Sequence, residues 1–160
     1  MKPVIIGMNN PYGADPRFAL YPLPVGSAGG RLYGMLQEAT GIGRQAYLET
    51  FERVNLVDGP WKAAAARERA AQLRPWLIGR HVILLGRAVQ AAFGIDADPL
   101  AEVVRTISVI PRFETVYHAV PHPSGRNLWY NNPANREAAK ALLARVHDDY
   151  SSMKKMEMAV

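Results

Sequence analysis

The chain has 160 residues, of which 49% are hydrophobic and 21% are charged, and its formal net charge is +5. This length and composition are typical of a single globular domain and argue against a disordered chain, and no apolar run is long enough to cross a membrane. The absence of cysteine excludes disulfide bonds and thiolate metal sites, and no signal-peptide pattern is found, so a cytoplasmic or nucleoid-associated location is the expectation.

The excess of basic residues concerns the partner of the protein. A positive charge of this size favours a polyanion, and DNA is the partner that we expect. On charge alone the alternative stays open, since many basic proteins of this size bind nothing acidic. We expect no membrane partner and a monomeric protein.

The first quarter of the chain predicts a strand, a long loop and a helix. Residues 4–6 are an apolar strand signal, and residues 8–26 are rich in Gly, Pro and Asn, which predicts a loop of a length that is usually functional. Ser27 is a suitable N-cap for a helix over residues 28–40. Two glycines in its first turn would let another backbone, or a phosphate, approach closely.

The middle of the chain alternates helices and strands. A short helix is expected over residues 44–50 and a second strand over residues 53–57. An Ala-rich helix follows from Trp61 to about Arg74, where Pro75 is expected to end it.

The remaining elements continue this alternation up to a polar tail. They are a buried strand over 82–85 ended by Gly86, a helix over 87–93, a helix from Pro99 to about Arg105, a strand over 116–120, a helix from Asn132-Pro133 to about Asp149, and a frayed tail over 151–160.

Apolar strands that alternate with helices define the expected fold class. They predict an α/β protein, a three-layer α/β/α sandwich with a central, mainly parallel four-stranded sheet, in which residues 1–150 form one domain. In such sheets ligands bind beyond the carboxyl ends of the strands. The polar residues that follow the strands should therefore converge on one cleft.

The segment 121–130 carries the strongest functional signal. His122 stands between two prolines, which restrict its backbone, and an imidazole held in this way can donate to an oxygen that gains charge in a transition state. A flexible Ser-Gly, a cation and two aromatics follow. We expect the part of this loop that contacts DNA to be Ser124, Gly125, Arg126, Asn127 and Leu128. Trp129 could also wedge into a strand, or it could pack with Tyr130 beneath the last helix.

Three asparagines lie at or after the ends of strands. An amide oxygen of Asn9 or Asn10 could position a water or hold the edge of a base, although Asn-Asn-Pro-Tyr-Gly is also an ordinary turn sequence. Asn55 lies in an apolar strand, where an unsatisfied amide costs roughly 1–3 kcal/mol. It either bonds loop backbone or reads the amide edge of a pyrimidine.

The long loop supplies aromatic side chains, while several common site signatures are missing. Tyr12, Phe18 and Tyr21 are candidates to stack on a base, although aromatics are more often part of a core. The sequence has no phosphate-binding loop, no dinucleotide fingerprint, no nucleophile elbow and no His, Asp and Glu cluster with metal-ligand spacing. We therefore expect no metal and no cofactor.

Four of these segments together resemble the uracil-DNA glycosylase superfamily, most closely its mismatch-specific and single-strand-selective branches. They are residues 7–11, 54–57, 82–86 and 122–127, in the order and strand context of that family. The resemblance implies that an asparagine positions the hydrolytic water. Aligned on Gly7 that residue is Asn9, and aligned on Pro11 it is Asn10.

The resemblance also implies roles for the other motifs. Asn55 would read the base, His122 would hydrogen-bond the departing base, and the residues after His122 would penetrate the duplex. The implied activity is that of a monofunctional DNA glycosylase that hydrolyses the N-glycosidic bond of uracil or a modified pyrimidine after base flipping. Two alternatives are a non-catalytic DNA- or nucleotide-binding protein of the same fold and an enzyme of this fold that acts on another modified base or nucleotide.

Overall fold

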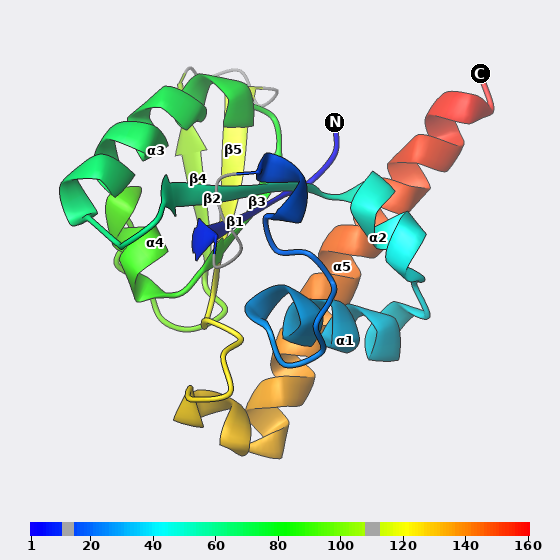
Figure 1. Cartoon of the computed structure of the whole chain (residues 1–160). Helices are drawn as coiled ribbons and strands as arrows, with labels where there is room; N and C mark the ends of the chain where they lie inside the picture. The colour runs from blue at the N-terminus through cyan, green and yellow to red at the C-terminus, as the bar shows by residue number, and fades with distance from the viewer. Residues whose placement is uncertain (11–14, 108–112) are drawn as a thin grey trace.

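The computed structural model describes residues 1–10, 15–107 and 113–160 (Figure 1). Five strands form one sheet in the order β2-β1-β3-β5-β4. They are β1 (Val4–Asn10), β2 (Glu52–Asp58), β3 (His81–Leu85), β4 (Glu102–Thr106) and β5 (Glu114–Val120). All neighbouring pairs are parallel except β4 and β5, so the sheet is mainly parallel with one antiparallel edge strand.

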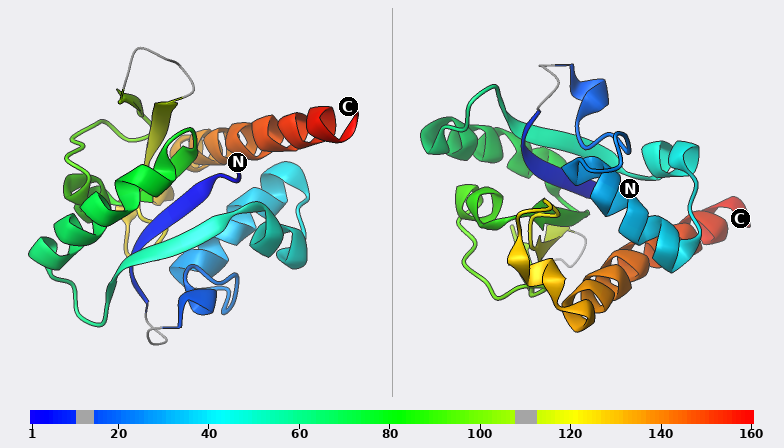
Figure 2. Two further views of the ribbon diagram at one scale, coloured as in Figure 1. Left: turned by 90° about the horizontal axis from the view of Figure 1, so that it is seen from above. Right: turned by 60° about the horizontal axis from the view of Figure 1, so that its bottom comes forward.

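Helices cover both faces of the sheet and complete the expected α/β/α sandwich (Figures 1 and 2). One face carries α1 (Ala28–Thr40), α2 (Arg44–Thr50) and α5 (Pro133–Met158), and the other carries α3 (Ala63–Leu77) and α4 (Arg87–Ala92). Successive residues of a strand point into the cores on opposite faces of the sheet. Ile5 and Ile83 pack with α1 and α5, while Ile6 and Leu84 pack with α3 and α4. The fold class predicted from the sequence is confirmed, with five strands in place of four.

The expected helix from Pro99 to Arg105 is wrong, because this segment contains the edge strand β4. Leu100 has a φ of 67°, which is incompatible with a helix, and its N–H donates to the Ala119 carbonyl at 2.6 Å. The following residues, Glu102–Thr106, include three β-branched side chains and pair along β5. Pairing with a neighbouring strand therefore outweighs the helix-start signal of the proline.

Two helices extend further than their sequence signals predict. Pro75 lies inside α3, which continues to Leu77, because Leu77 is fully buried against the sheet and this packing offsets the missing backbone N–H. The expected frayed tail is likewise helical: α5 reaches Met158, and its last turns project beyond the sheet with their methionines exposed (Figure 2). Among the described residues, no helix combines the length and apolar content needed to cross a membrane.

Candidate functional site

A small pocket of about 40 Å³ collects most of the polar residues that the sequence singled out. They include Asn9 from β1, Asn55 from β2 and His122 from the loop after β5. As expected, these three residues meet near the carboxyl ends of the strands. The wall opposite is the long loop and the start of α1. Its lining residues are Phe18, Leu20, Tyr21, Ser27, Ala28 and Gly29, with Met8 from β1.

The two neighbouring asparagines of β1 point to different places. β1 runs to Asn10, so that both residues lie within the strand and not in the turn after it. Asn9 lines the pocket and its Nδ2 donates to the Gly59 carbonyl at 3.1 Å. Asn10 is 6% exposed, its Nδ2 donates to the Asp15 carbonyl at 3.1 Å, and it lines a different cavity. Side-chain alternation along a strand thus places only Asn9 beside His122.

The Asn55 side chain lies against the backbone of Gly7, its register partner on β1. A Cβ added to Gly7 would come within 2.5 Å of Asn55 Oδ1, so the glycine makes room for the amide. The Asn55 amide forms no hydrogen bond with any residue that the structure describes. The expected alternative of a bond to loop backbone is therefore not found, and both the donor and the acceptor of this amide remain available to a ligand.

The contact between Gly7 and Asn55 gives a first prediction. The Gly7→Ala substitution should displace the Asn55 amide and lower activity on a base by about tenfold or more, because the new methyl group has to occupy the place of Oδ1. Gly43→Ala is the matched control, since a Cβ there meets nothing within 4 Å. Steady-state base release by the two variants, with far-UV circular dichroism of both, tests this. Equal activity would show that the position of Asn55 does not matter.

His122 is held in place by several contacts from its own loop. Asn127 Nδ2 donates to the His122 carbonyl at 2.9 Å, and the Tyr130 hydroxyl donates to the Pro121 carbonyl at 2.6 Å. The ring packs against Gly86, which has a φ of 90° and whose added Cβ would lie 3.1 Å from the His122 Cβ. Burial lowers the pKa of His122 below its usual value. The imidazole is therefore neutral at neutral pH and can donate one N–H.

The loop after His122 divides into a buried and an exposed part. Trp129 and Tyr130 pack on the core beneath α5, which was one of the two alternatives for Trp129, the other being insertion into a DNA strand. Their rings meet edge to face with centroids 4.8 Å apart. Leu128 is 77% exposed, and Arg126 is exposed without an ion pair in the described part of the chain. In this loop, Leu128 is therefore the hydrophobic group that a nucleic acid can reach, and Arg126 is the cationic one.

The long loop brings two of the expected aromatics to the pocket. Phe18 and Tyr21 both line it, and their rings meet edge to face at 5.5 Å. Tyr12 lies outside the described residues. The first-turn glycines of α1 serve the packing of this loop, because a Cβ at Gly29 or Gly30 would overlap the backbone of residues 20–25. The close approach that they allow is that of the protein's own chain.

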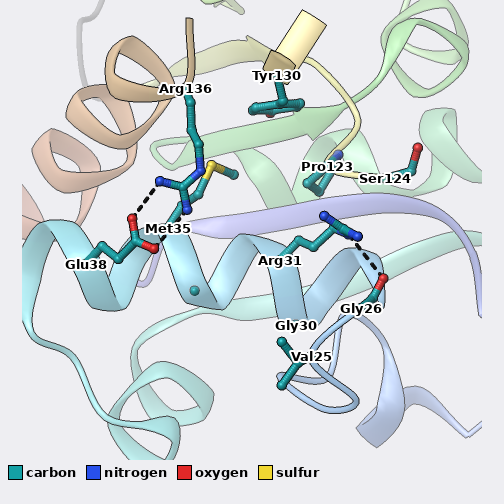
Figure 3. Close-up of a pocket in the computed structure, with 11 residues that line it drawn as sticks. Val25, Gly26, Gly30, Arg31, Met35, Glu38, Pro123, Ser124, Tyr130 and Arg136 are labelled. Carbon is teal, nitrogen blue, oxygen red and sulfur yellow. Dashed lines mark hydrogen bonds and ion pairs between the residues drawn. The ribbon is translucent and has the colours of Figure 1, made fainter. Parts of the chain in front are cut away.

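A groove of about 300 Å³ runs beside this pocket, between α1 and the loop after β5 (Figure 3). Arg31 reaches across it: its Nε donates to the Gly26 carbonyl at 3.2 Å, and its Nη2 would lie 2.6 Å from a Cβ added to Gly125. Arg136 Nη1 and Nη2 donate to the two carboxylate oxygens of Glu38 at 2.6 and 2.9 Å. These hydrogen bonds lower the pKa of Glu38 to about 2.

Within the described residues Arg31 has no acidic partner, so it is the cation of this groove that can receive an anion. The sequence did not single out Arg31, because nothing in its helix marks it and only the fold brings it into one groove with Pro123 and Ser124 (Figure 3).

One further group of side chains could hold a metal ion. His81, Glu102 and His118 offer ligand atoms that all lie within 4.8 Å of one another. Burial, and to a smaller extent the charges of His81 and Arg145, lower the pKa of His118 to about 4. No sequence motif marks this group, because its members come from three different strands and have no metal-ligand spacing along the chain.

No family model matches the chain, and no curated protein matches its sequence.

Proposed function

We propose that the protein is a monofunctional DNA glycosylase that releases uracil or a modified pyrimidine from DNA. The observation that supports this most is the meeting of Asn9, Asn55 and His122 in one pocket with the aromatic side chains of Phe18 and Tyr21. This set offers a water-positioning amide, a base-reading amide, a donor to the leaving base and a stacking surface. These are the groups that hydrolysis of a base with a stabilised anion needs.

Recognition of the base rests on Asn55 and the aromatic wall. The unbonded Asn55 amide can pair with a carbonyl and an N–H on the edge of a pyrimidine. A base reaches such a pocket only after flipping out of the stack, which costs a few kcal/mol.

The proposed reaction depends on a good leaving group. Among the described residues no carboxylate lines the pocket, and an asparagine is too weak a base to deprotonate water, so the glycosidic bond has to break before or as water attacks. Its electron pair passes to the base, where the His122 N–H stabilises the negative charge on a carbonyl oxygen of the pyrimidine. Asn9 Nδ2 donates to the Gly59 carbonyl, which leaves Asn9 Oδ1 to hold the water that adds to the sugar, and the proton that this water loses passes to the departed base anion.

The opened strand would be held by the loop after His122 and by the neighbouring groove. Leu128 is exposed and can fill the space left in the base stack, while Arg126 and Arg31 can contact phosphates on either side. The net charge of +5 supports the same partner.

The function is tested directly with oligonucleotides. Single- and double-stranded DNA carrying uracil, 5-hydroxymethyluracil or a thymine mismatch is incubated with the protein, and alkaline cleavage reveals abasic sites. We expect cleavage on at least one uracil-type substrate. Salt-sensitive binding without an abasic product would instead identify a non-catalytic binder. Neither binding nor product on any DNA would point to a small nucleotide substrate.

The groove gives a second prediction about DNA affinity. Arg31→Ala should weaken binding to DNA of any sequence several-fold and reduce the slope of log K against log salt concentration by about 1, since one phosphate contact is lost. Arg67→Ala on α3 is the matched control, because it removes an equal charge from an exposed site on the opposite face. Fluorescence anisotropy at several salt concentrations measures both. An equal loss in the two variants would show that only net charge matters.

A further inference from the structure

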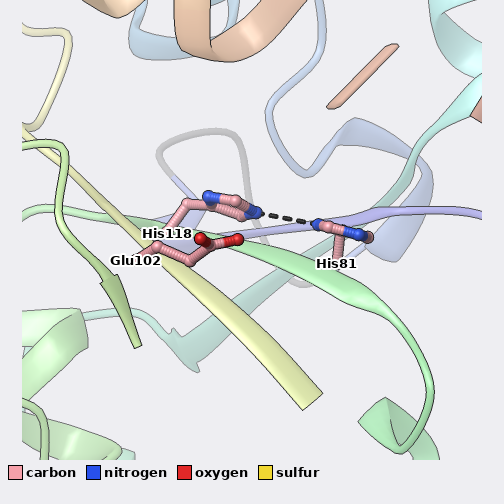
Figure 4. A group of neighbouring side chains, drawn as sticks. All are labelled: His81, Glu102 and His118. Atoms are coloured by element: carbon pink, nitrogen blue, oxygen red, sulfur yellow. Dashed lines mark hydrogen bonds between the residues drawn. The ribbon is translucent and has the colours of Figure 1, made fainter. Parts of the chain in front are cut away.

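Three side chains from neighbouring strands face one another on the α5 side of the sheet (Figure 4). His81 opens β3, His118 lies within β5, and Glu102 opens the edge strand β4 directly opposite His118. The His81 Nδ1 and the His118 Nε2 are 2.9 Å apart, and the two rings are nearly parallel, with centroids at 5.2 Å. The Glu102 carboxylate completes a set of one oxygen and two nitrogens within 4.8 Å.

This group is separate from the pocket described above. The pocket lies past the carboxyl end of β5, at His122. His118 lies inside β5, and His81 is at the amino end of β3. None of the three residues lines that pocket. An ion bound here would therefore stabilise the sheet and would take no part in the proposed release of a base.

His118 is buried beside His81, with which it shares its one ring hydrogen bond in the described part of the chain. His118 is 4% exposed, and among the described residues its Nδ1 is one of two buried side-chain polar atoms without a hydrogen-bond partner. The nearby guanidinium of Arg145 adds positive charge, which the Glu102 carboxylate opposes. A bound cation would give the two facing nitrogens and the carboxylate a common partner.

We propose that His81, His118 and Glu102 bind one divalent transition-metal ion of the Zn²⁺ class. Imidazole nitrogens and a carboxylate oxygen are the ligands that such ions take, and three protein ligands leave one position for water. At Zn–N distances of about 2.05 Å, the present nitrogen separation corresponds to an N–Zn–N angle near 90°, and a tetrahedral angle needs the rings to part by roughly 0.4 Å.

Binding balances without release of a proton. In the metal-free pair one of the two facing nitrogens carries the hydrogen of the N–H···N bond. When the ion takes both lone pairs, that hydrogen moves to the other nitrogen of its own ring, and both imidazoles stay neutral. The ion would then tie β4, a short strand whose residues are mostly exposed, to β3 and β5.

Isothermal titration of the chelator-treated full chain with Zn²⁺ tests the site. The chain contains four histidines and no cysteine, so few other strong ligands compete. We expect one ion per chain, at least tenfold weaker binding in Glu102→Gln, and loss of stoichiometric binding in His81→Ala. His147→Ala is the matched control, because His147 lies on α5 and pairs with Asp148, away from the three proposed ligands, and it should bind as the unmodified chain does.

A second readout covers the case in which His81→Ala does not fold. Zn²⁺ should raise the melting temperature of the unmodified chain and of His147→Ala by several degrees, and that of Glu102→Gln by clearly less. Glu102 is exposed, so this variant is expected to fold. Absence of stoichiometric binding, binding that is unchanged in Glu102→Gln, or binding that is lost in His147→Ala would each overturn the proposal.

Discussion

His122→Ala is expected to lower the rate of base release by about 10²–10³-fold, the usual effect of removing one preorganised donor from a developing negative charge. The donor is fixed before the substrate arrives, since Asn127 holds the His122 carbonyl and Gly86 lets the ring pack against the backbone. The loss should therefore appear in kcat more than in KM. Single-turnover assays on a uracil-containing oligonucleotide measure it.

Two comparisons make the result specific. His147→Ala removes a histidine from the surface of α5 and should leave base release unchanged. DNA affinity of His122→Ala should also stay within about twofold of that of the unmodified chain, because Arg126 and Leu128 remain. A rate within about threefold of the unmodified protein would remove His122 from the reaction.

The second large effect separates the two asparagines of β1. Asn9→Ala should reduce base release by about 10²-fold, because the attacking water loses the acceptor that orients it. Asn10→Ala should leave the chemistry nearly intact and instead lower the free energy of unfolding by about 1 kcal/mol, since the partly buried hydrogen bond to the Asp15 carbonyl is lost. Single-turnover rates and urea denaturation of the two variants measure both quantities.

The opposite pattern would reverse the assignment. If Asn10→Ala abolished base release while Asn9→Ala did not, the water would be held from the cavity that Asn10 lines, and the proposed pocket would be wrong. A loss of activity in both variants, with unfolding unchanged in both, would show that the two residues act together.

Local signals were sufficient for much of the framework. Ser27 caps α1 by accepting from the Gly30 N–H at 3.0 Å, and Gly41 ends this helix with a φ of 75°, so its bounds follow from residues within a few positions. The apolar runs of β3 and β5 likewise predict strands buried on both faces. These features are encoded next to where they act.

Features that depend on residues far away in the chain could not be predicted from the local sequence. β4 follows Pro99 closely and begins with the polar Glu102, and only its pairing with β5 makes it a strand. Pro75 would end an isolated helix, but burial of Leu77 carries α3 past it. The histidine pair and its glutamate come from three strands, so that no spacing in the sequence could reveal the group.

The sequence by itself determined that apolar strands alternate with helices and that an asparagine, a second asparagine and a proline-framed histidine lie near strand ends. Because parallel strands end at one edge of a sheet, that pattern was enough to predict one shared pocket. Only the tertiary structure decided that Asn9 and not Asn10 faces the pocket, and that Arg31 joins the neighbouring groove. Adjacent side chains of a strand point to opposite faces, and which face meets the site depends on pairing with residues far away in the chain.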